Sequence, residues 1–287
     1  MDRRAIVIGL AFALIWSSAY AVARIIVAEA PPLLSLAVRF TLSGAIALAM
    51  GLALGQRLRL TQGQWQATVV FGLCQNAIYL GLNFIAMQWI EASLAAIIAS
   101  SMPLQVAALG WLFRGERLPP LGLIGLALGF GGVTLIMAAR LTGGADPLAV
   151  LLCVLAALAL ATATLTLRGA ASGGNLWIVV GLQMWVGAAA LWPLGFAMET
   201  WHLPLNPRWI AAMTYQILMP GIVATVLWFA LVGRIGTVKA ASFHFLNPFL
   251  GVALAALLLG EGIRFTDMIG VAVVMAGILA VQKSRAG

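Results

Sequence analysis

The chain has 287 residues, of which 63% are apolar and 8% are charged, and it carries a formal net charge of +8. Because an average soluble domain is about half apolar and a quarter charged, this composition excludes a soluble globule, and the mean hydropathy of +1.07 predicts an integral membrane protein. The sixteen basic residues lie singly between apolar runs, so we expect no nucleic-acid partner. Cys74 and Cys153 also lie in apolar runs, which indicates neither a disulfide nor a metal site.

Ten apolar stretches, each near the roughly 20 residues that a helix needs to cross a bilayer, follow one another with very short connections. They are rich in Gly, Ala and Leu and show no alternation of period two, a pattern that favours helices over strands. We therefore predict an all-α membrane protein without a soluble domain. The predicted transmembrane helices span residues 6–27, 33–54, 66–89, 92–113, 120–140, 147–168, 174–198, 208–233, 236–259 and 265–283.

The basic residues predict the orientation of this bundle, because cytoplasmic loops carry an excess of Lys and Arg. With the first helix starting inside, eleven basic residues fall at cytoplasmic ends and four at the opposite ends. We therefore expect both termini in the cytoplasm and the protein in a bacterial inner (plasma) membrane. The eleven are Arg3, Arg4, Arg57, Arg59, Arg114, Arg117, Arg168, Arg234, Lys239, Lys283 and Arg285, and the four are Arg24, Arg140, Arg208 and Arg264.

The second half of the chain repeats the first. Because five helices recur and five is odd, the second copy crosses the membrane in the opposite sense. We expect residues 1–140 and 141–287 to form two inverted five-helix repeats, an architecture of many secondary transporters, although a duplication that serves only a symmetric scaffold stays open. A shift of 145 residues pairs Pro103 with Pro248, Gly115 with Gly260, Glu116 with Glu261, Gly125 with Gly270 and Gly132 with Gly277.

These features together resemble a known family. The Trp16-Ser17-Ser18 stretch, the two prolines, the Gly-Glu pairs at 115/116 and 260/261 and the inverted duplication are similar to the EamA branch of the drug/metabolite transporter superfamily, over essentially the whole chain. Within that branch the chain looks most like amino-acid exporters of the YddG type. The resemblance implies a basket-shaped bundle with a central cavity. It also implies export of aromatic and other neutral amino acids or similar metabolites.

Pro103 and Pro248 lie equally deep in the fourth and ninth predicted helices, near the bilayer centre. A proline there frees the carbonyl four residues earlier, at Ala99 and His244, and bends or breaks the helix. A matched pair of interrupted helices indicates a transporter binding site or hinge. A simple packing kink is the alternative for each proline alone.

Polar side chains around these prolines are candidate solute contacts, because polar groups inside a membrane are costly unless they face a partner or a wet cavity. On the third helix, Gln75, Asn76, Tyr79 and Asn83 share one face and should point inward. The alternative is that these groups bond neighbouring helices to one another. The full candidate set is Trp16, Ser17, Gln75, Tyr79, Asn83, Ser100, Ser101, Gln105, Tyr215, His244 and Asn247, with Pro103 and Pro248 as helix breaks.

Charged and aromatic side chains inside the helices complete the candidate site. Trp16 lies halfway along the first helix, where its indole is able to stack on an aromatic or apolar solute. Arg39 lies about six residues into the second predicted helix, and we interpret it as snorkelling to the surface or contacting the helix end, with attraction of an anion as the alternative. If transport is proton-coupled, His244 and Lys239 are the candidate coupling groups, since no Asp or Glu lies near a midplane.

The sequence thus predicts a secondary transporter that exports small neutral metabolites, most of all amino acids, across the inner membrane by alternating access, as facilitated diffusion or exchange. Proton-coupled export of other metabolites or drugs is the alternative of the same class. An intramembrane enzyme or a channel is the alternative of another class.

Other chemistry has little support in the sequence. No G-x-x-x-x-G-K-[ST] loop is present, so we expect no ATP hydrolysis. His202 and His244 have no carboxylate near them in sequence, so no enzymatic reaction, catalytic residue or metal site is predicted, and no cofactor is expected. The expected partners are a small-molecule solute and the lipid bilayer, and the oligomeric state stays open.

Overall fold

The computed structural model describes residues 3–115, 119–166, 175–235, 240 and 242–286, and every regular element in this part of the chain is a helix. In chain order these are α1 (Arg3–Val27), α2 (Pro32–Ala53), α3 (Gln62–Phe71), η1 (Gly72–Tyr79), α4 (Leu80–Ala86), α5 (Ala92–Ser100), α6 (Met102–Arg114), α7 (Pro120–Thr142), α8 (Pro147–Thr166), α9 (Leu176–Met198), α10 (Pro207–Leu218), η2 (Met219–Val223), α11 (Ala224–Ile235), η3 (Ser242–Leu246), α13 (Asn247–Leu259) and α14 (Phe265–Ala286).

These helices form the segments that the sequence predicts, with small differences at their ends. Within the described residues, nine segments are long and apolar enough to cross a membrane, and Phe243–Leu259 is a shorter apolar helix where the ninth span is predicted. The third segment starts at Gln62 rather than at residue 66. Thr61 and Gln64 form a capping box there, which satisfies backbone N–H groups of the first helical turn and so extends the helix beyond its apolar part.

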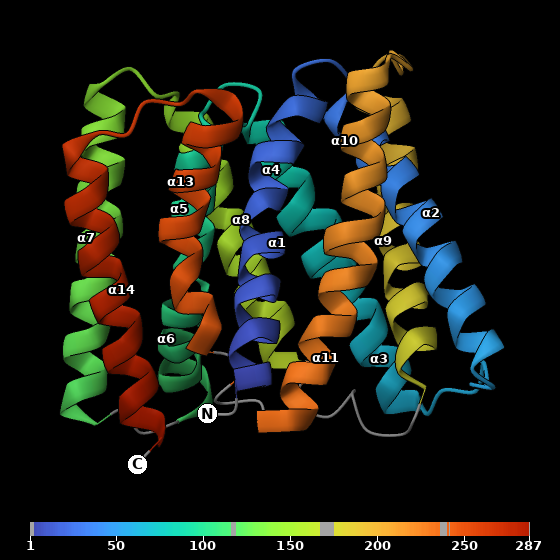
Figure 1. Ribbon diagram of the computed structural model, residues 1–287, viewed down its shortest axis with the longest axis horizontal. Helices are drawn as coiled ribbons and strands as arrows, with labels where there is room; N and C mark the ends of the chain where they lie inside the picture. The colour runs from blue at the N-terminus through green and yellow to red at the C-terminus, as the bar shows by residue number, and fades with distance from the viewer. Residues whose placement is uncertain (1–2, 116–118, 167–174, 236–239, 241, 287) are drawn as a thin grey trace.

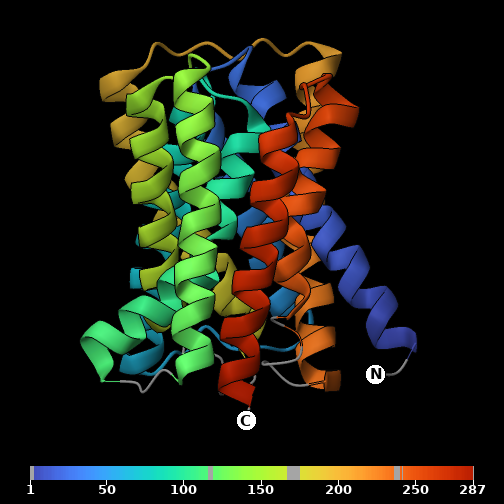
Figure 2. The same ribbon diagram turned by 90° about the vertical axis from the view of Figure 1, so that its left-hand side faces the viewer.

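Successive segments run in opposite directions between the two ends of the bundle (Figure 1). α1 begins and α14 ends at the same end, which we call the base, and we call the opposite end the far end. α8 begins at the far end, whereas α1 begins at the base, so the second set of five segments is inverted relative to the first. Equivalent helices of the two halves pack together, α2 against α9 and α7 against α14, and Figure 2 shows α7 and α14 side by side.

Four glycines bring α7 and α14 into close contact. A Cβ atom added at Gly132 would lie 2.9 Å from the carbonyl oxygen of Gly270, and one at Gly125 would lie 2.8 Å from that of Gly277. Gly270 is the repeat mate of Gly125, and Gly277 is that of Gly132, so the contact has approximate two-fold symmetry. Small residues have this role between membrane helices, because they let two backbones approach closely.

Both predicted proline breaks are present. α5 ends at Ser100 and α6 starts with Pro103 in its first turn, while η3 gives way to α13 with Pro248 in its first turn. A proline fits the first turn of a helix because the N–H it lacks has no intrahelical partner there. α6 and α13 also end alike, at Gly115 (φ 64°) and Gly260 (φ 71°), in the left-handed conformation that glycine adopts without strain.

The third segment of each half contains a π-helix that the sequence does not predict. η1 lies between α3 and α4, and η2 lies between α10 and α11. A π-helix closes its hydrogen bonds over five residues rather than four and is frequent at functional sites. The two π-helices therefore widen the backbone at corresponding depths, beside the cavity described below.

Acidic side chains hold helix starts at the far end. The carboxylate of Glu199 accepts hydrogen bonds from the backbone N–H groups of Leu33 and Leu34, both at 2.9 Å. Glu261 accepts from those of Ala92 and Ser93 at 2.7 and 3.0 Å. Each carboxylate thus satisfies two N–H groups that have no partner within their own helix and also neutralises the positive end of its dipole.

A buried ion cluster joins α7, α14 and the start of α5 at the same end. Asp267 has no exposed surface and accepts hydrogen bonds from Nε and Nη2 of Arg140 at 3.2 and 2.5 Å. Arg140, which is 2% exposed, also donates to Glu91 and, at 3.4 Å, to Ser93. These contacts connect both halves of the protein across the far end.

Candidate solute-binding cavity

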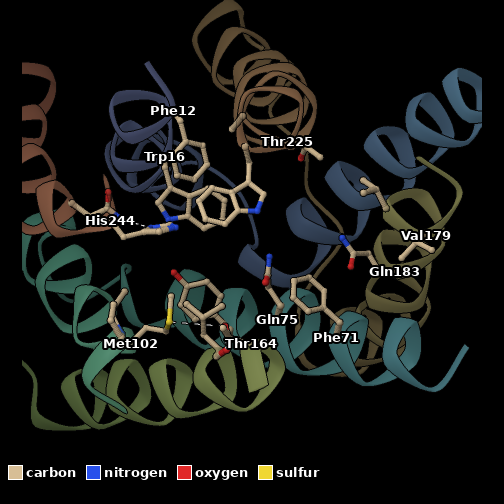
Figure 3. A pocket seen from close by; sticks show the side chains of 18 of the residues that line it. Phe12, Trp16, Phe71, Gln75, Met102, Thr164, Val179, Gln183, Thr225 and His244 are labelled. Carbon is tan, nitrogen blue, oxygen red and sulfur yellow. Dashed lines mark hydrogen bonds between the residues drawn. The ribbon is translucent and has the colours of Figure 1, made fainter. Parts of the chain in front are cut away.

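A cavity of about 250 Å³ extends from the middle of the bundle to the base, and we call it the main cavity. Its wall is mostly apolar with a few polar groups, which is the usual composition of a small-molecule site. At the base it reaches the starts of α3 and α9, and Figure 3 shows the side chains that point into it. It is lined by Phe12, Trp16, Tyr20, Gln64, Phe71, Gln75, Tyr79, Ala99, Ser100, Met102, Pro103, Leu160, Thr164, Asn175, Leu176, Val179, Val180, Gln183, Ala224, Thr225, Trp228, His244 and Asn247.

A second, smaller pocket of about 90 Å³ continues toward the far end, and we call it the deep pocket. The two spaces share residues of their walls, including Trp16, Tyr79 and Gln183. The deep pocket also reaches Met87, near the end of α4. Together the two spaces offer a solute a continuous wall from the base past the centre of the bundle.

His244 lies in an aromatic enclosure at the side of the main cavity. Its ring meets Phe12 edge-on at 5.2 Å between centroids and Trp16 edge-on at 6.0 Å, and Trp228 lies at 5.3 Å. Its Nδ1 atom is 3.0 Å from Nδ2 of Asn247, which belongs to the same broken segment. The break before α13 therefore presents an imidazole and an amide to the cavity, beside the indole of Trp16 (Figure 3).

The predicted polar face of the third segment does point inward. Gln75 and Tyr79 line both spaces, while Asn76 and Asn83 line the deep pocket. Tyr79 is hydrogen-bonded to Tyr20 of α1, and both tyrosines line both spaces. Asn76 also serves as a contact between helices, because its Nδ2 donates to the carbonyl oxygen of Gln183 at 2.9 Å.

Other predicted site residues lie outside both spaces and form hydrogen bonds within or between helices. Ser17 donates to Oδ1 of Asn247 at 3.4 Å, and Tyr215 lies 2.6 Å from the hydroxyl of Ser18. The Ser101 hydroxyl accepts from Gln105 at 2.9 Å. Of the residues around the fourth segment's break, Ser100 and Pro103 line the main cavity, whereas Ser101, Gln105 and the equivalent Pro248 do not. Lys239 lies outside the described residues.

Several cavity residues were missed by the sequence analysis. Phe12 and Tyr20 lie four residues before and after Trp16, on the same helical face, so the helical period would have found them. Gln183, Thr225 and Trp228 also line the main cavity. Gln183 is the one amide in α9 and Thr225 the one hydroxyl residue in α11, so the rule that singled out Gln75 would have found both. Trp228 carries no such signal, because a tryptophan in an apolar helix is equally able to face lipid.

The electrostatics of the main cavity are close to neutral. Of the described side chains that line it, none is an Asp, Glu, Lys or Arg, and His244 is its one ionisable group besides the tyrosines. Within the described residues no group of three or more His, Cys, Asp or Glu side chains is placed to hold a metal ion. The wall offers aromatic surface, amides and hydroxyls to a solute.

An all-helical membrane protein with two inverted halves, matched broken helices and a cavity at their interface has the architecture of a secondary transporter. The chain belongs to the EamA-like transporter family, whose model matches residues 3–138 and again residues 147–282. The domain boundary that we expect at residue 140 stays a prediction.

The chain is similar to curated transporters, over nearly its whole length in two of the cases below and over about half of it in a third. The "Uncharacterized transporter YvbV" of Bacillus subtilis is 28% identical over 96% of this chain and 92% of the relative. A "Probable amino-acid metabolite efflux pump" of Salmonella typhimurium is 26% identical over 97% and 94%. The "Aromatic amino acid exporter YddG" of Ancylobacter novellus is 31% identical over 48% of each chain. One solved structure, described only as "Crystal structure of protein", shares the fold with a TM-score of 0.70 and 23% identity, over 98% of this chain and 96% of the other.

Proposed function

We propose that this transporter exports small neutral metabolites, above all amino acids with aromatic or apolar side chains, by alternating exposure of the main cavity to the two sides of an inner membrane. The observation that carries the proposal is the cavity itself. It reaches the bundle centre from the base and offers a solute the rings of Phe12, Trp16 and Trp228 beside amides and hydroxyls. Two relatives whose names refer to amino-acid efflux or export support the same solute class.

The charge distribution supports an orientation with the base in the cytoplasm. Among the described residues, Lys and Arg are more frequent in the helix ends and loops of the base, as at Arg3, Arg57 and Lys283, than in those of the far end, where all the described Asp and Glu residues lie. An excess of Lys and Arg is typical of cytoplasmic loops. In this orientation the structure represents the state that is open to the cytoplasm and closed outside by the contacts of Glu199, Glu261 and Arg140.

The neutral wall of the main cavity supports facilitated diffusion or exchange as the mode of transport. Proton-coupled carriers commonly relay protons through buried carboxylates, and no described carboxylate lines either space. If a proton gradient nevertheless drives flux, His244 is the candidate coupling group within the described residues.

The test is solute flux into liposomes that contain the purified protein, with a panel of labelled amino acids and with or without an imposed proton gradient. We expect saturable flux that other neutral amino acids compete for, without need of the gradient. Flux that requires the gradient would instead support proton coupling, and a conductance of ions that does not depend on solute would indicate a channel. No flux of any amino acid by folded protein would overturn the proposed solute class.

Three substitutions test the site within the same assay. Trp16→Ala, Tyr79→Ala and His244→Ala each remove a side chain that lines the main cavity, and each should lower flux about tenfold, the equivalent of about 1.4 kcal/mol of lost solute contact. The amount of protein in the membrane should not change. Trp89→Ala is the matched control, because Trp89 is 58% exposed and lines neither space. Normal flux in all three variants would contradict the site while leaving the family assignment intact.

A further inference from the structure

Arg39 is buried rather than snorkelling to the surface. It lies in α2 and is 6% exposed, so our interpretation from the sequence is wrong. The side chain does not reach the helix end because it turns inward, where it lines the deep pocket together with Tyr79 and Gln216. A guanidinium in such a place is always charged and is costly to bury without a partner.

No anionic partner for Arg39 is found among the described residues. Its Nε atom is buried without a hydrogen bond, and the ring of Phe40 lies 5.2 Å from the guanidinium carbon. The hydroxyl of Tyr79 also interacts electrostatically with the guanidinium, but it is neutral and does not balance the charge. The far-end carboxylates are engaged elsewhere. Glu199 binds the start of α2, and Glu29 binds Asn206 at 2.7 Å. The deep pocket therefore contains an uncompensated positive charge.

Two unsatisfied acceptors line the same pocket. Asn83 is 1% exposed and Gln216 has no exposed surface, yet Oδ1 of the first and Oε1 of the second have no hydrogen-bond partner. The orientation of each amide is fixed by its donor group. Nδ2 of Asn83 donates to the carbonyl oxygen of Tyr79 at 2.8 Å, and Nε2 of Gln216 donates to that of Ala19 at 2.6 Å. Each buried acceptor that is left without a hydrogen bond costs free energy.

We propose that the deep pocket recognises the two charged groups of an α-amino acid. Arg39 binds the carboxylate, in the bidentate geometry that a guanidinium favours, and the amide oxygens of Asn83 and Gln216 accept hydrogen bonds from the ammonium group. The solute side chain then extends past Trp16 into the main cavity. This inference rests on the proposed function, and it names the residues that distinguish an amino acid from an uncharged metabolite or an amine.

The test compares competitors that differ in one charged group. Liposomes with the protein take up labelled leucine while phenylalanine, phenylalaninamide (no carboxylate) or 3-phenylpropionate (no ammonium) competes. In the unaltered protein, phenylalanine should inhibit at least tenfold more strongly than the amide. Arg39→Gln should abolish this preference, and Arg39→Lys should keep part of it. Asn83→Leu should weaken the inhibition by phenylalanine and by phenylalaninamide to the same extent. It should leave the inhibition by 3-phenylpropionate unchanged.

Controls separate this inference from a structural role and from the proposed function. Arg208→Gln removes an arginine whose side chain is 69% exposed and should keep the full preference. Arg39→Gln should not lower the melting temperature, because it removes an unpaired buried charge, whereas a lower melting temperature with an unchanged preference would show a purely structural arginine and overturn the inference. The preference should also persist when gluconate replaces chloride, and its loss there would assign Arg39 to an inorganic anion.

The melting temperature of the purified protein reports ligand binding even if no amino acid is transported. 3-Phenylpropionate should raise the melting temperature of the purified protein and should not raise that of Arg39→Gln. An absence of flux together with this shift would reject the proposed function alone. The Arg39 subsite alone would be rejected by two results together. The melting temperature would show no shift, and Arg39→Gln would transport leucine with an unchanged preference for phenylalanine over its amide as competitor.

Discussion

Asp267→Ala is expected to destabilise the protein by about 3–5 kcal/mol, because it removes the fully buried partner of an ion pair and leaves the charge of Arg140 only partly compensated. Arg140 is 2% exposed and would keep Glu91 as its one carboxylate partner among the described residues, beside the Ser93 hydroxyl at 3.4 Å. The side chain of Glu91 is 41% exposed and partly in contact with solvent. Thermal unfolding in detergent should show a lower melting temperature for this variant.

Two further variants make that result specific. Asp146→Ala is the matched control, since Asp146 is exposed and its carboxylate accepts a hydrogen bond from the backbone N–H of Ala149 at 2.9 Å. Its loss should cost about 1 kcal/mol, as for other helix caps. The double variant Arg140→Met with Asp267→Leu should recover most of the lost stability, because apolar residues of similar volume often replace a buried ion pair without cost. An Asp267→Ala protein as stable as the original would show that the ion cluster contributes nothing.

The second large effect is expected from Gly132→Leu, which should destabilise the bundle by about 3 kcal/mol, at the upper end for overpacking. The first added atom would already lie 2.9 Å from the carbonyl oxygen of Gly270 and 3.0 Å from the backbone nitrogen of Val274. Backbone atoms in a neighbouring helix have little freedom to move aside, so α7 and α14 would have to separate.

Gly131→Leu provides a control one residue away. A Cβ atom at Gly131 meets no atom within 4 Å, and the residue is exposed. Both substitutions change helix propensity and hydrophobicity identically, so the difference between their melting temperatures isolates the contact between α7 and α14. Equal stability of the two variants would contradict a close-packed contact at Gly132.

The sequence predicts most of the fold because a membrane allows few alternatives. Apolar stretches of the right length become helices, since every backbone polar group must be satisfied within the bilayer. The repeat of Pro103 and Pro248 predicted the two broken segments, and both are present. The π-helices were not predicted, because the residues of η1 and η2 also fit an α-helix, and a change from four- to five-residue hydrogen bonds leaves no pattern in the sequence.

The site was predicted less completely than the fold. Trp16, Gln75, Tyr79 and His244 do line the main cavity, because aromatic and polar side chains in an apolar helix stand out. Arg39 was misinterpreted, because its distance from the helix end fits both snorkelling and burial, and only the packing of α2 against its neighbours decides between them. Ser17, Tyr215 and similar residues show the same ambiguity, since hydrogen bonds between helices need the residue types that a solute site needs.

The glycine contact between α7 and α14 is isologous, because each half presents the same pair of glycines to the other, as two identical subunits do in a dimer with two-fold symmetry. A single five-helix unit would reproduce this contact only by pairing with a second copy inserted in the opposite direction, so one sequence would need two membrane topologies. Joining the halves through the short connection at residues 143–146 removes that requirement. Each half is then free to acquire its own charges, and Arg114 at the base end of α6 accordingly has Leu259 as its repeat mate at the far end of α13.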